Sequence, residues 1–158
     1  MKVIKNEQKG FSLIELLIVV AIILIIAAIA IPNLLRSKMA ANEASAVASL
    51  RTLNTVIVEY SITYATDPSN LASLAPATTP SSTAADLVDN LLGKDPAVKS
   101  GYSIAYTAVA GTPITSYSML ATPSSTTTGQ RKFFTDQSGV IRQTTDGSTP
   151  TASSTPIG

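Results

Sequence analysis

The sequence predicts an α+β fold, in which a long, kinked N-terminal helix packs on a small antiparallel β-sheet of about four strands. Three observations support this prediction. An unbroken apolar run extends from Leu16 to Ile31, and apolar residues then recur at helical spacing as far as Tyr64. Beyond residue 99, short segments alternate apolar and polar residues and are separated by turn residues, as is typical of strands.

The first part of the predicted helix, residues 11–35, is long enough to cross a membrane. It spans 25 residues, which corresponds to about 37 Å of helix, against a hydrocarbon core of about 30 Å. Its isoleucines, leucines and valines occupy the whole circumference and leave no polar face for water. The segment is therefore predicted to span a bilayer rather than to lie on its surface.

Residues 1–10 carry the charges that would orient this segment. Lys2, Lys5 and Lys9, with Glu7, directly precede the apolar run. A lysine bias beside a membrane segment keeps that end cytoplasmic and sends the C-terminal part across. Composition alone leaves two alternatives open, an uncleaved signal anchor and a leader that is removed.

A short motif decides between these alternatives. Residues 9–16 read Lys-Gly-Phe-Ser-Leu-Ile-Glu-Leu, and this segment resembles the prepilin signature of type IV pilins and their relatives. In that family, a membrane peptidase cuts after the glycine and methylates the new N-terminus. The resemblance implies that Gly10 ends the leader and that Phe11 becomes the methylated first residue. It is close from Gly10 to about Tyr64, and beyond that it extends only to the general layout.

Glu15 is a carboxylate in a segment otherwise suited to lipid, and the resemblance gives it a partner. A charged acid at the centre of a bilayer costs about 2.5 to 3.5 kcal/mol on insertion scales, so Glu15 is expected to have a partner. Cleavage after Gly10 would create an amine on Phe11, one helical turn away in the same chain or in a neighbouring chain. Such a pair would set the register between subunits. The alternative is that Glu15 merely reaches the membrane interface.

Pro32 lies inside the helical pattern, which continues through Arg36. A proline removes one backbone donor and clashes with the preceding turn, so a bend is predicted near residues 28–32. The local flexibility at this bend would let the helix stretch or repack during assembly. The alternative is that Pro32 marks the end of the membrane span, and the two interpretations are compatible.

The second half of the helix, residues 36–64, is predicted to be amphipathic and to pack on a globular domain. Glu43, Arg51, Thr52, Thr55 and Glu59 are expected on the other faces. A tyrosine pair, Tyr60 and Tyr64, is interpreted as packing rather than as a redox or cofactor site. The residues of the packing stripe are Met39, Val47, Leu50, Leu53, Ile57, Tyr60 and Tyr64.

The remainder of the chain divides into a connecting segment, a sheet and a tail. Residues 67–70 form a turn, residues 71–74 one helical turn, residues 75–83 a loop and residues 84–92 a short helix. Four strands are predicted, at residues 100–109, 116–122, 130–135 and 140–144. The full division is leader 1–10, membrane or filament-core helix 11–35, amphipathic half 36–64, connecting loop with a short helix 65–98, sheet 99–144 and a mobile Ser/Thr-rich tail 145–158.

Composition excludes much chemistry. The chain has no cysteine and no histidine, so disulfides and the commonest general base are missing. Paired carboxylates and Ser-Lys arrangements do not occur at a recognisable spacing, so the chain is not expected to be an enzyme or to need a cofactor. A calcium clip at Asp136 and Asp146 is weighed against the simpler interpretation that both residues form Asx turns. The net charge of +1 offers no footprint for nucleic acid.

The resemblance therefore implies a major structural subunit of a type IV pilus. The expected partners are identical subunits in a homopolymer, a prepilin peptidase/methylase, the pilus assembly machinery and the membrane. Before assembly, the chain would cross the bacterial inner membrane once with its C-terminal domain in the periplasm, and afterwards it would belong to an extracellular filament. The alternative is a pseudopilin of a type II secretion system.

Overall fold

The computed structural model describes residues 10–157. The predicted leader, apart from Gly10, lies outside these residues. The chain divides into two units, Met1–Arg36 and Ser37–Gly158, and one helix, α1, belongs to both. Six strands follow it in the second unit.

Helix α1 extends from Leu13 to Tyr64 and contains Pro32 without a break in its assignment. It ends where Ala65 adopts a left-handed conformation, with φ of 56°. The amide of Ala65 donates to the carbonyl of Ser61, at 2.9 Å, and closes the last turn. The predicted long helix is therefore confirmed, while a bend near residues 28–32 stays a prediction.

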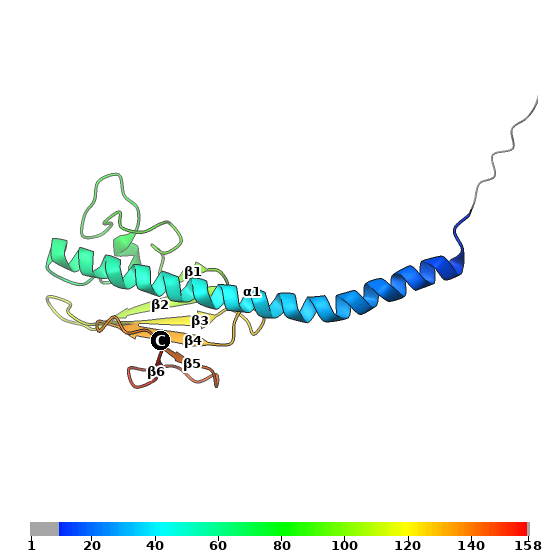
Figure 1. Ribbon diagram of the computed structural model, residues 1–158. Helices are drawn as coiled ribbons and strands as arrows, with labels where there is room; N and C mark the ends of the chain where they lie inside the picture. The colour runs from blue at the N-terminus through cyan, green and yellow to red at the C-terminus, as the bar shows by residue number, and fades with distance from the viewer. Residues whose placement is uncertain (1–9, 158) are drawn as a thin grey trace, which may run out of the picture. The chain divides into compact units, whose positions relative to one another are not determined.

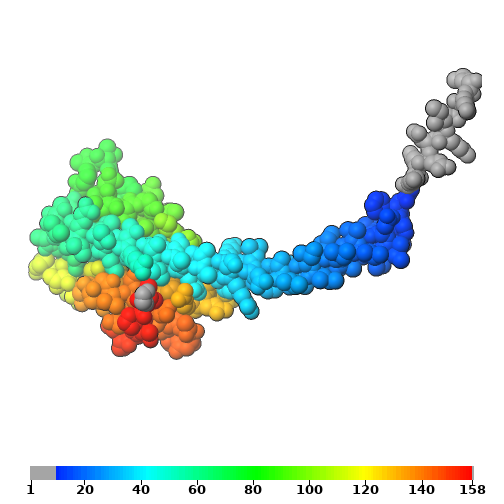
Figure 2. Space-filling view, viewed as in Figure 1, coloured from blue at the N-terminus to red at the C-terminus, as the bar shows by residue number. Residues whose placement is uncertain are grey.

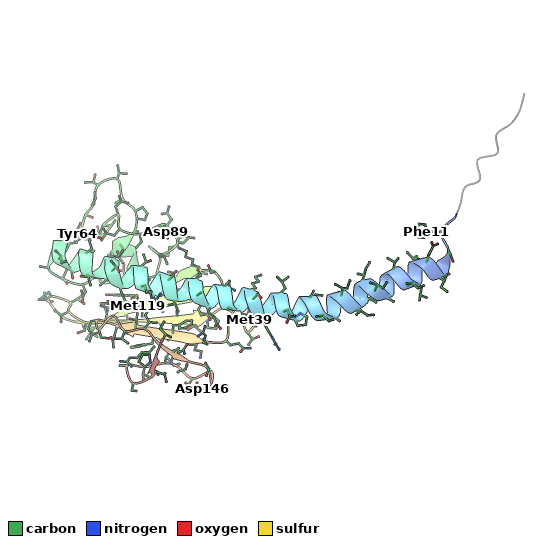
Figure 3. The ribbon with its side chains drawn as sticks, viewed as in Figure 1. Phe11, Met39, Tyr64, Asp89, Met119 and Asp146 are labelled. Carbon is green, nitrogen blue, oxygen red and sulfur yellow. The ribbon has the colours of Figure 1, made fainter. Side chains whose placement is uncertain are left out.

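In the first unit, α1 exposes its apolar side chains on every side. Between residues 10 and 36, Ala27 alone is half-buried and the others are exposed. Figure 3 shows these side chains projecting all around the blue part of the helix, which begins close to the labelled Phe11. As predicted, no polar face is present in this part of α1.

In the second unit, α1 runs along one face of the sheet, as Figure 1 shows. Leu50, Leu53, Ile57 and Tyr60 are buried there, and Val47 and Tyr64 pack against the same core. The predicted packing stripe is therefore confirmed except for Met39, which is not part of this core. Tyr60 and Tyr64 pack with ring centroids 4.7 Å apart, and the Tyr60 hydroxyl donates to the Ser82 carbonyl at 2.6 Å. The tyrosine pair is thus part of the packing of the head.

The sheet is a meander of six antiparallel strands rather than the four predicted. Each strand pairs with the one before it, in the order β1-β2-β3-β4-β5-β6. The strands are β1 Ala97–Lys99, β2 Tyr102–Ala108, β3 Tyr117–Pro123, β4 Lys132–Asp136, β5 Arg142–Thr144 and β6 Thr155–Pro156. Tyr102, Met119 and Phe133 point inward and are fully buried against the α1 stripe.

The additional strand β1 changes the beginning of the sheet. Residues 100 and 101, predicted as the start of a strand, instead form the turn between β1 and β2. Ser100 has φ of 50° and Gly101 has φ of 73°. Positive φ at both central residues is the geometry of a two-residue hairpin turn. The Ser-Gly pair is therefore a turn signal that the strand prediction overlooked.

The additional strand β6 overturns the prediction of a mobile tail. The Ile157 amide donates to the Ile141 carbonyl at 2.9 Å, and Arg142 Nη1 donates to the Ser154 carbonyl at 2.9 Å. Pro150 is among the fully buried side chains. Residues 150–157 are thus held on the sheet, because they satisfy the free edge of β5.

The helix predicted at residues 84–92 is also wrong, whereas the helical turn at Leu71–Leu74 is present as the 3₁₀ helix η1. The amides of Ala85 and Leu87 donate to the carbonyls of Ser73 and Leu74, at 2.9 and 3.1 Å. These bonds to a distant segment replace the helical ones. Asp86, with φ of 55°, cannot continue a right-handed helix. Figure 2 shows the green segment after α1 standing out from the surface of the second unit.

Candidate processing and assembly site

The candidate site is the beginning of α1. Gly10, Phe11 and Ser12 precede the helix and are not helical, and the Leu16 amide donates to the Ser12 carbonyl at 3.2 Å as the first helical bond. Phe11 is 82% exposed, and a Cβ added to Gly10 would meet nothing within 4 Å. The predicted cleavage point, between Gly10 and Phe11, is therefore exposed and lies outside the helix.

Glu15 folds back onto the start of the helix. Its Oε2 accepts the backbone N–H of Ser12 at 3.2 Å. Ser12 is the residue before the helix and Glu15 is its third helical residue, which is the arrangement of one half of a capping box. Glu15 thus has a partner in the uncut chain. The signal for it, Ser-x-x-Glu at residues 12–15, was present in the sequence, and sequence reasoning missed it.

The segment that follows has the properties of a membrane span. An 18-residue window of α1 near the N-terminus has a mean hydropathy of 3.3, and none of this window is buried in the chain. A core helix of a soluble protein would bury such a surface. Pro32 lies in this first unit, distant in sequence from the group formed by Gly10, Phe11 and Glu15.

The two carboxylates weighed as a calcium clip accept hydrogen bonds within their own turns. Asp136 accepts the Ser138 amide at 2.9 Å, and Asp146 accepts the Ser148 amide at 3.0 Å. The hydroxyl and amide of Ser148 lower the pKa of Asp146. Among residues 10–157, no group of three or more acidic side chains could hold a metal ion. Calcium at Asp136 and Asp146 stays a prediction, and the Asx turns are what the structure shows.

A shallow groove beside α1 holds two other carboxylates. It is lined by Ser45, Ser49 and Thr52 of α1 and by residues 86–89 of the following segment. Asp89 accepts the Leu92 amide at 2.8 Å and pairs with Lys99 at 3.4 Å. Asp86 lies 3.4 Å from the Ala77 amide, which donates to it. Both acids are therefore engaged in holding the loop.

Two comparisons with known proteins concern the same N-terminal segment. Residues 5–31 match the model of the prokaryotic N-terminal methylation motif. The chain is also similar to the type IV wide pilus major component PilA4 of Thermus thermophilus, with 56% identity over 45 residues. That similarity covers 28% of this chain and 34% of the relative. The chain thus matches only about a third of the relative's length.

The long apolar helix, its exposed start and the methylation motif are features that this chain shares with membrane-anchored proteins whose N-terminus is modified. Among such proteins, the chain is similar to a component of a type IV pilus. Together these findings support the resemblance predicted from the sequence, since the N-terminal segment is similar to that of a type IV pilin. The head has the corresponding α+β layout, with a long helix on an antiparallel sheet.

Proposed function

We propose that the chain is a structural subunit of a type IV pilus. It is inserted into the bacterial inner membrane through α1, with the head in the periplasm. A prepilin peptidase cuts after Gly10 and methylates Phe11, and the assembly machinery then stacks identical subunits into an extracellular filament. No catalytic activity of its own is part of this role.

One observation carries this proposal. From Leu13 to Arg36 the chain is an uninterrupted helix whose apolar side chains are exposed in the single chain, Ala27 alone being half-buried. Water would disfavour this surface by roughly 25 cal/mol for each Å² exposed. Lipid can cover it before assembly, and the same segment of neighbouring copies can cover it afterwards. A filament subunit needs both environments in turn.

The role proposed for Glu15 follows from its position. In the uncut chain its carboxylate accepts the Ser12 amide. Cleavage after Gly10 would place a charged amine on the residue directly before Ser12, within reach of the same carboxylate. In a neighbouring chain, the amine would meet the carboxylate in a medium of low dielectric constant, where a misaligned charge is costly. We therefore assign to the pair the setting of subunit register.

Electron microscopy of cells tests the proposed function. Cells that produce the chain are expected to carry long surface filaments with this chain as the main protein, and cells without it are expected to lack them. Secretion of exported proteins should be unchanged in both. Loss of secretion without loss of surface filaments would instead assign the chain to a secretion pseudopilus and overturn the proposal.

A further inference from the structure

A polar network fastens α1 to the head at a single level near the beginning of the second unit. Asn42 Nδ2 donates to the Thr128 carbonyl at 2.9 Å. Glu43 Oε1 accepts the amides of Gln130 and Arg131 at 3.0 and 3.2 Å. Glu43 Oε2 accepts Arg131 Nε at 2.7 Å. All these partners lie in the loop that precedes β4.

The glutamate in this network is buried, in contrast to the exposed position expected from the sequence. Glu43 is only 8% exposed. Its acceptor atoms are matched by three donors, one of them charged, and such bonds are about twice as strong as neutral ones. Arg131 is itself held, because its Nη1 donates to Gln143 of β5 at 2.9 Å. The network therefore links α1 to two parts of the sheet.

No comparable contact exists earlier in the helix. Among the described residues of α1 before Glu43, from Leu13 to Asn42, no side chain is buried. Apolar packing of the helix begins at Ala46. Apart from Asn42, which belongs to the network, this earlier part is held by its own backbone bonds, and Pro32 lacks the donor for one of them. Helix segments without tertiary contacts open at low free-energy cost.

We propose that Glu43 and Arg131 form a stop on α1. Opening of the helix that starts in the unpacked part ends at the network, so that the packed part and the sheet stay folded. The membrane or filament segment can then change its conformation without unfolding the head. This inference goes beyond the proposed function, and it holds whether or not the chain forms a filament.

Hydrogen exchange of the full chain in detergent micelles, followed by mass spectrometry, tests the stop. In the wild type, residues 36–42 should exchange fast and residues 44–50 slowly. In Glu43→Ala, exchange of residues 44–50 should accelerate by about tenfold, the effect expected for losing a charged hydrogen bond. Exchange of β2 to β4, residues 102–136, should not change. Glu43→Gln, which keeps an acceptor oxygen, should give a smaller acceleration.

Glu59→Ala is the matched control, because Glu59 is an exposed acid on the same helix. It should leave both regions as in the wild type. If residues 44–50 exchange as slowly in both Glu43 variants as in the wild type, the network does not act as a stop. If residues 102–136 accelerate by the same factor as residues 44–50, Glu43 supports the whole head rather than a boundary in α1. Either result overturns the inference, and Glu43→Gln supplies the comparison if Glu43→Ala does not fold.

Discussion

Glu15 has one partner in the uncut chain, and the proposed processing would give it a second. The carboxylate caps the helix by accepting the Ser12 amide, and in the proposed filament it pairs with the amine of Phe11. The first role needs only an acceptor oxygen, whereas the second needs a negative charge. The two roles are therefore separable by substitution.

We expect both Glu15→Gln and Glu15→Leu to abolish filament assembly, because neither retains the charge. Glutamine keeps the acceptor for Ser12, so the cap alone would survive in that variant. Sheared filaments are collected by centrifugation and quantified with an antibody, and the membrane fraction is measured as the control for expression. Wild-type amounts of filament from Glu15→Gln would reduce Glu15 to a helix cap.

Glu43 makes the stability of the head depend on pH. Burial alone would raise the pKa of this carboxyl, but hydrogen bonds from Gln130 and Arg131 outweigh burial and lower the pKa below its usual range. A lowered pKa means that the folded state binds fewer protons than the unfolded one. The stabilisation is therefore complete above the ordinary glutamate pKa of about 4.3, and it is lost as the pH falls through the folded value.

Thermal unfolding of the full chain in detergent, followed by circular dichroism, checks this dependence. At pH 7, Glu43→Gln should be less stable than the wild type by about 1 to 3 kcal/mol, the cost of weakening a charged hydrogen bond. The difference between the two proteins should shrink as the pH is lowered below about 4.3. A difference that is constant from pH 7 to pH 3 would show that the charge of Glu43 does not matter.

At the scale of the element, the C-terminal segment is a strand and not a loose tail. It pairs with β5 through Arg142 and Gln143, which face Pro156 and Thr155, and it buries Pro150. Residues 150–157 should therefore resist a nonspecific protease under conditions that cut the exposed loop at residues 75–83.

Replacement of the buried Pro150 tests this prediction specifically. Pro150→Gly should make the segment cleavable and should lower stability by about 1 to 2 kcal/mol, because the unfolded chain gains freedom and apolar contact is lost. Ala152→Gly, at an exposed position, serves as the control. Equal rates of cleavage in the wild type and Pro150→Gly, measured by mass spectrometry, would contradict the docked strand.

The elements that the sequence predicts well are those with a long or strong local pattern. Helix α1 has a sustained apolar period, and the turn after Asp136 contains Gly139, whose φ of 71° requires a residue like glycine. The short strands β1 and β6 have three and two residues and carry no period. The segment 84–92 has a helical pattern, but its amides bind the carbonyls around η1 instead.

The functional residues divide in the same way, into those that a local sequence pattern reveals and those that only the fold brings together. Gly10, Phe11 and Glu15 could be identified because the motif is contiguous in sequence. The burial of Glu43 could not, since its partner Gln130 lies 87 positions away. A lone glutamate on a helix is usually exposed. Only the fold brings it to the loop before β4.

At the scale of the whole molecule, the two units have separate tasks. The first unit, up to Arg36, carries the motif and the exposed apolar surface, and it would supply insertion and assembly. The second unit carries the packed core and would form the outer part of the filament. The proposed function of the first unit depends on one event, the removal of the leader after Gly10.

The mass and N-terminal sequence of the protein in purified surface filaments test that event most directly. The filament protein should begin at Phe11 and be heavier by one methyl group, with the methyl on the terminal amine. A filament protein that begins at Met1, or at any residue other than Phe11, would contradict it. In that case the amine proposed as the partner of Glu15 would not exist.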